Sequence, residues 1–415
     1  MKNKLKILNI VTSNTGGAGN AVLRISKTIN EFSDSKIIAL KGKKSNDSII
    51  IPNFKPYFFL IKAIRFLRHF YYSRLSKKFN KKYSFYNYGE QYNYISPLKL
   101  IKYFPFNPDI IIVHFISHFI NFKTIYELQK LTGCKVLFNV LDTSFMTGGC
   151  HWSWDCTGYI SGCSGCPAIK SSYNRRLSKD NLDQKISFIE KIDYSVNVSS
   201  TFAYDQVLSC KLFKSKKPSK IYYPIDQNIF KPDNFKCSSI KKIIFFGTQD
   251  HKNLNKGIIY FEKALDELSN LLLENEKNNI EIRIAGKNNK LRIPFGFDVI
   301  YLGKLSIDKL INEYINTDVF VSSSVEDNGP MMINEALMCG SPVVCFDTGI
   351  GPDLINNLTG YLAKNFSSQD LAKGIYKVLF KSDLKKLKKG ARHFAVKKYG
   401  NKIIKKNWET LVRNI

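Results

Sequence analysis

The sequence lacks long apolar runs and is poor in acidic residues. No run of 18 uncharged apolar residues occurs, so a membrane-spanning helix is not expected. The first residues do not show the pattern of a signal peptide, which is a charged stretch followed by an apolar stretch and a cleavage site. Residues 5–12 are instead expected to form a first buried strand. Only 34 Asp and Glu stand against 63 Lys and Arg, a formal net charge of +29. This excess predicts an anionic partner.

Size and cysteine content bound the class of protein. A chain of 415 residues with a hydrophobic fraction of 44% predicts two globular domains. Nine cysteines without a secretory signal are expected to be thiols or metal ligands in a reducing compartment. Charge alone would also suit nucleic acid, but no nucleic-acid recognition module accompanies it, so no nucleic-acid partner is expected.

The most informative stretch is 318–351. A β-rich run at 318–323 leads into the acidic turn 326–329, and a helix is expected to start at Pro330. The segment 340–342 (GSP) then ends that helix, and 343–346 is expected to be another strand. This order predicts an α/β domain with a parallel sheet, which binds ligands at the carboxyl ends of its strands. The start of a helix there offers unpaired N–H groups to anions.

Within this stretch, Asp327 and Glu335 are separated by seven residues, and CGSPV follows at 339–343. The pattern resembles the donor-site signature of glycosyltransferase family 4, which comprises retaining enzymes of GT-B fold that use nucleotide sugars. The first acid in that family is ordinarily Glu, so Asp327 is a departure. The resemblance implies that Glu335 binds the donor ribose and that the turn with Asn328 and Gly329 lies against the sugar. The alternative is a surface acidic turn that caps a helix.

Two further segments bear on the donor diphosphate. A glycine-rich turn with Gly16 and Gly17 follows the first strand, and glycine lets a backbone approach a pyrophosphate at a helix start. The family resemblance implies that this turn faces the donor phosphates across an interdomain cleft. It also implies a basic pair in the second domain, of which only Lys256 is present. An uncharged residue replaces the arginine, so Lys256, Lys252 or His251 must supply the charge.

Two residues at strand ends are predicted for the sugar and acceptor side. The run PDIIIVH ends at His114, and the strand 135–140 is followed by Asp142. The resemblance implies that His114 enters the cleft, although a histidine at a strand end can equally be structural. Many relatives carry a histidine where this chain has Leu141, so only Asp142 carries over.

The loop after Asp142 is rich in cysteine and glycine. Four cysteines fall in a C-x5-C-x6-C-x2-C spacing: Cys150, Cys156, Cys163 and Cys166. Four thiols in so short a segment match a closed tetrahedral zinc site, while an iron–sulfur cluster or four reduced thiols stay open as alternatives. The block TGGCH at 147–151 resembles that of a bacterial polysaccharide-assembly subgroup of family 4. A zinc ion here would be structural, and no catalytic metal is expected.

The insert 54–82 carries nine Lys or Arg and no acid. Apolar residues at helical spacing line one side of it and basic residues another, which is typical of a helix on a membrane surface. The alternative is a helix that docks with its apolar side on the first domain.

Together these features predict an α/β chain of two Rossmann-like domains facing across a cleft, the GT-B fold. The domains are expected at 1–222 (acceptor side) and 223–396 (nucleotide-sugar binding), with a terminal helix at 397–415 crossing back to the first domain. The expected function is retaining transfer of a hexosyl or N-acetylhexosaminyl group from a nucleotide-diphosphate sugar to a hydroxyl of a lipid-linked or oligosaccharide acceptor. The setting would be surface polysaccharide assembly, capsule or O-antigen, with the protein cytoplasmic and peripheral at the inner face of the plasma membrane.

Two other classes stay open. One is a GT-B enzyme of another type, a sugar-nucleotide epimerase or a phosphorylase. The other is a non-catalytic scaffold that kept the fold, which the missing arginine and Leu141 make conceivable.

Overall fold

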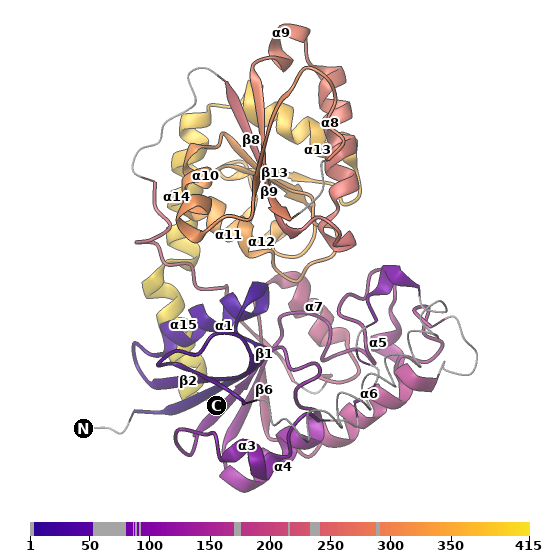
Figure 1. The fold of residues 1–415 in the computed structure, drawn as a ribbon, viewed down its shortest axis with the longest axis vertical. Helices are drawn as coiled ribbons and strands as arrows, with labels where there is room; N and C mark the ends of the chain where they lie inside the picture. Colours follow the sequence, from indigo (N-terminus) through magenta and orange to yellow (C-terminus); the bar gives the residue numbers. More distant parts are fainter. Residues whose placement is uncertain are drawn as a thin grey trace. The chain divides into compact units, whose positions relative to one another are not determined.

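The computed structural model describes residues 4–52, 80–85, 87, 89–90, 93–169, 176–214, 216–232, 241–287 and 291–415. The basic insert predicted at 54–82 lies outside these ranges up to residue 79. The chain forms two compact units (Figure 1). The N-terminal unit comprises Met1–Ser199, Ala203–Ile221 and Lys405–Ile415, and the C-terminal unit comprises Ser200–Phe202 and Tyr222–Ile404.

The N-terminal unit is built on a seven-stranded sheet in the order β3-β2-β1-β4-β5-β6-β7, in which every neighbouring pair is parallel. Its strands are β1 (Lys6–Ser13), β2 (Asp34–Lys41), β3 (Ser48–Ile50), β4 (Ile110–Val113), β5 (Lys135–Asn139), β6 (Tyr194–Val198) and β7 (Ser219–Lys220). All four residues of β4 are buried. A strand covered on both faces is expected to be apolar throughout, which explains the run IIIV.

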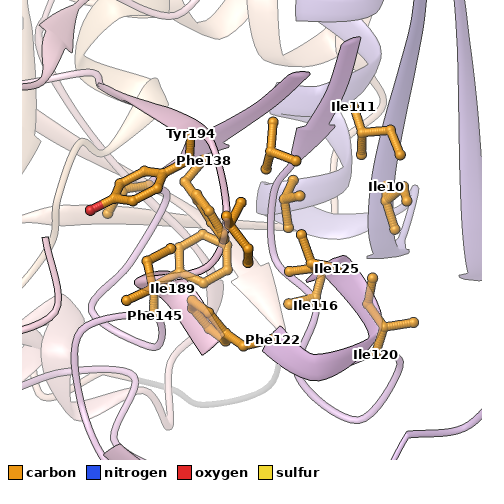
Figure 2. Packing of buried hydrophobic residues seen from close by; sticks show 14 of the residues in the cluster. Ile10, Ile111, Ile116, Ile120, Phe122, Ile125, Phe138, Phe145, Ile189 and Tyr194 are labelled. Atoms are coloured by element: carbon orange, nitrogen blue, oxygen red, sulfur yellow. The ribbon is translucent and has the colours of Figure 1, made fainter. Parts of the chain in front are cut away.

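Helices connect these strands (Figure 1). They are α1 (Gly16–Ile29), the short helix η1 (Lys81–Tyr83), α3 (Pro97–Ile101), α4 (Phe122–Thr132), α5 (Gly158–Ser161), α6 (Arg176–Ile189) and α7 (Thr201–Ser209). Figure 2 shows the main core of the unit, where Ile10 and Ile111 of the sheet and Ile125 of α4 are buried together. Phe138 of β5 stacks on Phe122, with ring centroids 5.3 Å apart.

The C-terminal unit has a six-stranded parallel sheet in the order β10-β9-β8-β11-β12-β13. Its strands are β8 (Lys242–Asp250), β9 (Ile280–Lys287), β10 (Asp298–Gly303), β11 (Val319–Ser322), β12 (Val343–Phe346) and β13 (Gly360–Ala363). Its helical segments are η3 (Leu254–Lys256), α8 (Ile258–Leu271), α9 (Glu274–Lys277), α10 (Ile307–Asn316), α11 (Met331–Met338), α12 (Gly351–Leu354), α13 (Ser368–Tyr376), η4 (Lys377–Lys381) and α14 (Leu384–Tyr399).

The last helix, α15 (Asn401–Arg413), returns to the first unit, because Lys405–Ile415 belongs to the N-terminal unit. Trp408 of this helix is buried, and Lys405 forms an ion pair with Glu31 at 3.1 Å. The predicted fold class, α/β with two Rossmann-like units and a returning terminal helix, is confirmed. None of the helices in the described ranges has the length and hydrophobicity needed to cross a membrane.

Candidate functional site

In the C-terminal unit, the predicted donor residues lie on the segments that follow β8 and β11. These strands are parallel neighbours, so their carboxyl ends lie at the same edge of the sheet. Lys256 ends η3, after β8, and its Nζ forms an ion pair with Oδ2 of Asp327 in the turn after β11. The Asp327 side chain is 9% exposed and that of Lys256 is 27% exposed. The structure therefore brings together two residues that the sequence predicted separately.

Backbone contacts hold this ion pair in place. Oδ1 of Asp327 accepts a hydrogen bond of 3.0 Å from the amide of Gly329, which leaves the turn tightly closed. The hydroxyl of Ser323 donates to the carbonyl of Lys256 at 2.9 Å, and the side-chain Nδ2 of Asn255 donates to the carbonyl of Glu326 at 3.1 Å. The two turns thus hold each other, and Lys256 and Asp327 are positioned by both.

Two glycines allow the turns to approach. Gly257 has a φ of +62°, and a Cβ there would lie 1.9 Å from the carbonyl oxygen of Ser323. Gly349 has a φ of +58°, and a Cβ there would lie 2.2 Å from the carbonyl oxygen of Asp327. Since a side chain is strained at such φ values and would also clash here, both positions require glycine.

Several polar groups near this edge are buried without partners. The side-chain amides of Asn328 and Asn334 are fully buried, and neither their N nor their O atoms hydrogen-bond to any described residue. The hydroxyl of Thr248, in β8, is likewise buried and without a partner in the described part of the chain. A buried polar group without a partner costs about 1–3 kcal/mol, so each such group calls for an explanation.

Glu335 lies within α11 and is 5% exposed. Its Oε2 accepts a hydrogen bond of 3.1 Å from the hydroxyl of Tyr314 on α10. This contact fixes the carboxylate at the helix that follows the Asp327 turn. The ribose-binding role of Glu335 stays a prediction.

In the N-terminal unit, Gly16 and Gly17 form the first residues of α1, directly after β1. Gly16 has a φ of +79°, and a Cβ on Gly17 would meet nothing within 4 Å. Gly19, one turn further on, is packed against the backbone of Asn14, from which a Cβ would lie only 2.3 Å away. The open space at Gly17 leaves room for a ligand, and phosphate binding stays a prediction.

Asp142 follows β5 and pairs with a residue that the sequence had placed only beside a cysteine. Its Oδ2 lies 3.0 Å from Nδ1 of His151, and its Oδ1 accepts a 2.8 Å bond from the amide of Ser144. Burial acts to raise the pKa of Asp142, but the neighbouring imidazole and these hydrogen bonds outweigh it and lower the pKa below its ordinary value. The ring of Phe115, after β4, lies 4.9 Å from the His151 ring. His151 lies nine positions after Asp142 in the sequence, and no local periodicity predicts the pairing.

The loop that carries this pair is held in place by Lys185 of α6 and by the hydrophobic core. Lys185 of α6 is buried and donates to the carbonyls of Ser144 and Thr147 at 2.7 and 2.9 Å. Its Nζ also lies 3.7 Å from the buried carboxylate of Glu90. Phe145 of the same loop inserts into the core beside Phe138 and Phe122 (Figure 2). The loop is therefore packed firmly against the N-terminal unit, so it can hold Asp142 and His151 in fixed positions.

His114 has a structural environment. It is fully buried at the end of β4; its Nε2 lies 3.0 Å from Oδ1 of Asn9, and its Nδ1 lies 3.1 Å from Nδ2 of Asn139. Burial lowers its pKa to about 3, so the ring stays neutral. Because Asn side chains occupy both ring nitrogens, this placement lends no support to a catalytic His114 and favours the structural alternative.

The four cysteines predicted as metal ligands line one pocket of the N-terminal unit: Cys150, Cys156, Cys163 and Cys166. Within the described ranges, however, no group of three or more His, Cys, Asp or Glu side chains is arranged to hold a metal ion. The predicted zinc or iron–sulfur site is therefore not supported by the described residues, although the structure does bring the four thiols together. All four are free cysteines.

Comparison with known proteins bears on both units. Residues 240–381 match the family model for glycosyl transferases group 1, which covers the turns of Lys256 and Asp327. No curated protein matches the chain in sequence.

Solved structures match almost the whole chain. A glycosyltransferase from Rickettsia africae is 16% identical with a TM-score of 0.62, over 99% of this chain and 98% of that one. The Anabaena protein HepE in complex with UDP and glucose is 13% identical with a TM-score of 0.64, over 99% and 100%. Sucrose-phosphate synthase from Thermosynechococcus elongatus is 14% identical with a TM-score of 0.64, over 99% and 98%. The chain therefore has the GT-B fold of these enzymes, and its C-terminal unit contains a region that matches glycosyl transferases group 1.

Proposed function

We propose that this protein is a glycosyltransferase that moves a sugar from a nucleotide-diphosphate sugar to a hydroxyl of a glycan acceptor. The observation that carries the proposal is the Lys256–Asp327 ion pair, held by two interlocked turns at one sheet edge within the region 240–381. The Anabaena HepE structures support a nucleotide sugar as the donor class, since HepE was solved with UDP and glucose and with UDP-glucose.

In this proposal the C-terminal unit binds the donor. Lys256 neutralises diphosphate charge, and Asp327 and Gly329 receive the sugar. The unpartnered amide of Asn328 and hydroxyl of Thr248 gain hydrogen bonds from the ligand, which removes the cost of burying them alone. Glu335 binds the ribose hydroxyls. Catalysis comes from positioning and from preorganised charges that stabilise the developing phosphate charge.

The N-terminal unit serves the acceptor and the phosphates. Gly16 and Gly17 offer backbone N–H groups at the start of α1. Asp142 orients the ring of His151 through their 3.0 Å contact, and the pair binds sugar or acceptor hydroxyls at the carboxyl end of β5. Transfer proceeds with retention, by front-face attack in which the leaving diphosphate helps to take the acceptor proton, as the family resemblance implies.

The acceptor is proposed to be lipid-linked and the protein to bind an anionic membrane surface during surface polysaccharide assembly. Among the described residues, five exposed lysines of α14 support this: Lys385, Lys386, Lys389, Lys397 and Lys398. No acidic residue lies within α14, so the helix presents a basic surface.

A panel of nucleotide sugars tests the function. A binding donor raises the melting temperature of the protein, and a radiolabelled form of that donor then gives labelled glycan. Asp327→Asn and Glu335→Gln should abolish transfer, whereas Glu274→Gln, an exposed carboxylate on α9, should leave it intact. Release of a rearranged nucleotide sugar or of a sugar phosphate would instead identify an epimerase or a phosphorylase, and an inert protein would identify a scaffold.

A further inference from the structure

The proposed function assigns no role to two buried polar side chains of α6. Asn181 and Lys185 are four positions apart, so they project from the same side of the helix. Asn181 is 4% exposed and Lys185 is 2% exposed. Because a lysine is almost never buried so deeply unless its charge is paired, the contacts of Lys185 call for a reason.

Both side chains donate hydrogen bonds to the loop that follows β5. Nδ2 of Asn181 donates to the carbonyl of Gly148 at 2.9 Å. Nζ of Lys185 donates to the carbonyls of Ser144 and Thr147 at 2.7 and 2.9 Å. Three carbonyls within five residues of the loop are therefore held by one face of one helix. We call Asn181 and Lys185 the α6 clamp.

The carbonyls that Lys185 holds belong to residues that also bind the segment of Asp142 and His151. The amide of Ser144 donates to Oδ1 of Asp142 at 2.8 Å. The hydroxyl of Thr147 donates at 2.6 Å to the carbonyl of the residue that precedes His151. A shift of either clamped carbonyl would therefore move Asp142 or the backbone beside His151.

The side of the clamp that faces away from the loop is fixed as well. Oε2 of Glu90 lies 3.7 Å from Nζ of Lys185, and the amide of Glu90 donates to Oδ1 of Asn181 at 3.0 Å. Nδ2 of Asn121, the cap of α4, donates to the carbonyl of Glu90 at 2.8 Å. Glu90 thereby ties both clamp residues to the start of α4.

We propose that the α6 clamp positions the acceptor side for glycosyl transfer: Asn181 and Lys185 hold the loop so that Asp142 and His151 meet the acceptor in one fixed arrangement. This inference rests on the proposed function of that pair. Both clamp side chains are buried and act through the loop, whereas the donor is bound by the C-terminal unit. Loss of the clamp should therefore slow transfer without weakening donor binding.

Lys185→Met and Asn181→Leu test the proposal in the full chain. Each replaces a clamp residue by an apolar side chain and removes its bonds to the loop. The substrate is the nucleotide sugar that stabilises the wild type, beginning with UDP-glucose. We expect kcat to fall by about 10- to 100-fold and the donor Kd to change by less than about threefold, because a displacement of about 1 Å is costly in rate. Asn181→Leu serves alone if Lys185→Met, which leaves Glu90 unpaired, does not fold.

Lys388→Met is the matched control. Lys388 is also 2% exposed and pairs with Asp318 at 3.5 Å. Asp318 directly precedes β11, at the end of this strand opposite to the Asp327 turn. The control should lower the melting temperature and leave kcat unchanged below it. A wild-type kcat in both clamp variants, or an equal loss of kcat in the control, would overturn the proposal.

Hydrogen exchange separates this inference from the proposed function, because it needs no substrate. The amide of Thr147 donates to the carbonyl of Thr143 at 3.1 Å, so its exchange reports on the loop. In both clamp variants this amide should exchange at least about tenfold faster, and in the control it should not change. A wild type that transfers no sugar would refute the proposed function, while unchanged exchange in both clamp variants would overturn the clamp whether or not transfer occurs.

Discussion

At the scale of single residues, the donor side depends on a charge that is already partnered. Lys256 faces Asp327, so under the proposed function the diphosphate would share the lysine with a carboxylate that is almost buried. Such an arrangement keeps the lysine in place before the ligand arrives, which lowers the entropy cost of binding. It also means that removing the lysine leaves Asp327 buried and unpaired.

Lys256→Ala should weaken nucleotide-sugar binding by about 30-fold or more, because truncating one partner of a buried charge pair costs roughly 2–5 kcal/mol. Calorimetric titration measures the change. Lys252→Ala removes an exposed lysine from the same turn and should change binding by less than about threefold. Equal losses of affinity in the two variants would show that binding depends on the overall positive charge of this turn and not on the position of Lys256.

A second prediction concerns Gly349, which packs against the Asp327 turn. Gly349→Ala places a methyl group against the carbonyl of Asp327 at a φ of +58°, so it should destabilise the C-terminal unit by about 1–3 kcal/mol and weaken donor binding. Gly303→Ala has a similar φ of +64° but meets nothing within 4 Å. This control should show the strain alone and keep donor affinity, as measured by urea unfolding and titration. Loss of donor affinity in both variants would mean that backbone strain alone weakens binding, and that the conformation of the Asp327 turn is not what the donor requires.

At the scale of elements, a buried polar network crosses the N-terminal sheet. Asn9 of β1 donates to Ser35 of β2 at 2.9 Å and meets His114, which contacts Asn139 of β5. Asn139 in turn accepts from Asn197 of β6 at 2.8 Å. Each member hydrogen-bonds to a residue of a neighbouring strand, although Oδ1 of Asn197 has no partner among the described residues, so the network favours this strand order over others.

His114 makes stability depend on pH. Its folded pKa of about 3 lies below the ordinary value of 6.5, so the unfolded chain takes up a proton in this window that the folded chain refuses. Stability is therefore lost as the pH falls, by roughly 2 kcal/mol between pH 7 and pH 5. In urea denaturation, the advantage of the wild type over His114→Gln should shrink by this amount at pH 5. The exposed His393→Gln should show no such change; a constant His114 difference would contradict the assignment.

The sequence predicted elements better than contacts between them. The apolar runs before His114, Asp142 and Gly247 identified β4, β5 and β8, because buried parallel strands are apolar throughout. The sequence did not predict the bulge that extends β8 to Asp250, where the register of β8 against β9 shifts. The contact of Lys185 with Glu90 and the pairing of Asp142 with His151 were also missed, since they depend on how distant segments pack and no spacing encodes them.

At the scale of the whole molecule, the net charge of +29 favours anionic surfaces. The protein should bind vesicles containing phosphatidylglycerol, and binding should fall steeply with salt. Lys385→Ala with Lys389→Ala on α14 should weaken it by roughly 30-fold, given about 1 kcal/mol for each basic residue near the surface. Lys304→Ala with Lys309→Ala removes the same charge elsewhere in the C-terminal unit and serves as control. Sedimentation with neutral vesicles to the same extent would contradict the electrostatic account.

We propose that this chain binds a nucleotide sugar by its diphosphate, at the sheet edge where Lys256 meets Asp327. The most direct test is calorimetric titration of the full chain with nucleotide sugars, beginning with UDP-glucose, and with the matching nucleoside diphosphate and monophosphate. We expect one nucleotide sugar and its nucleoside diphosphate to bind much more tightly than the monophosphate, and Lys256→Ala to abolish this difference. Binding that does not depend on the second phosphate, or that Lys256→Ala leaves unchanged, would contradict it.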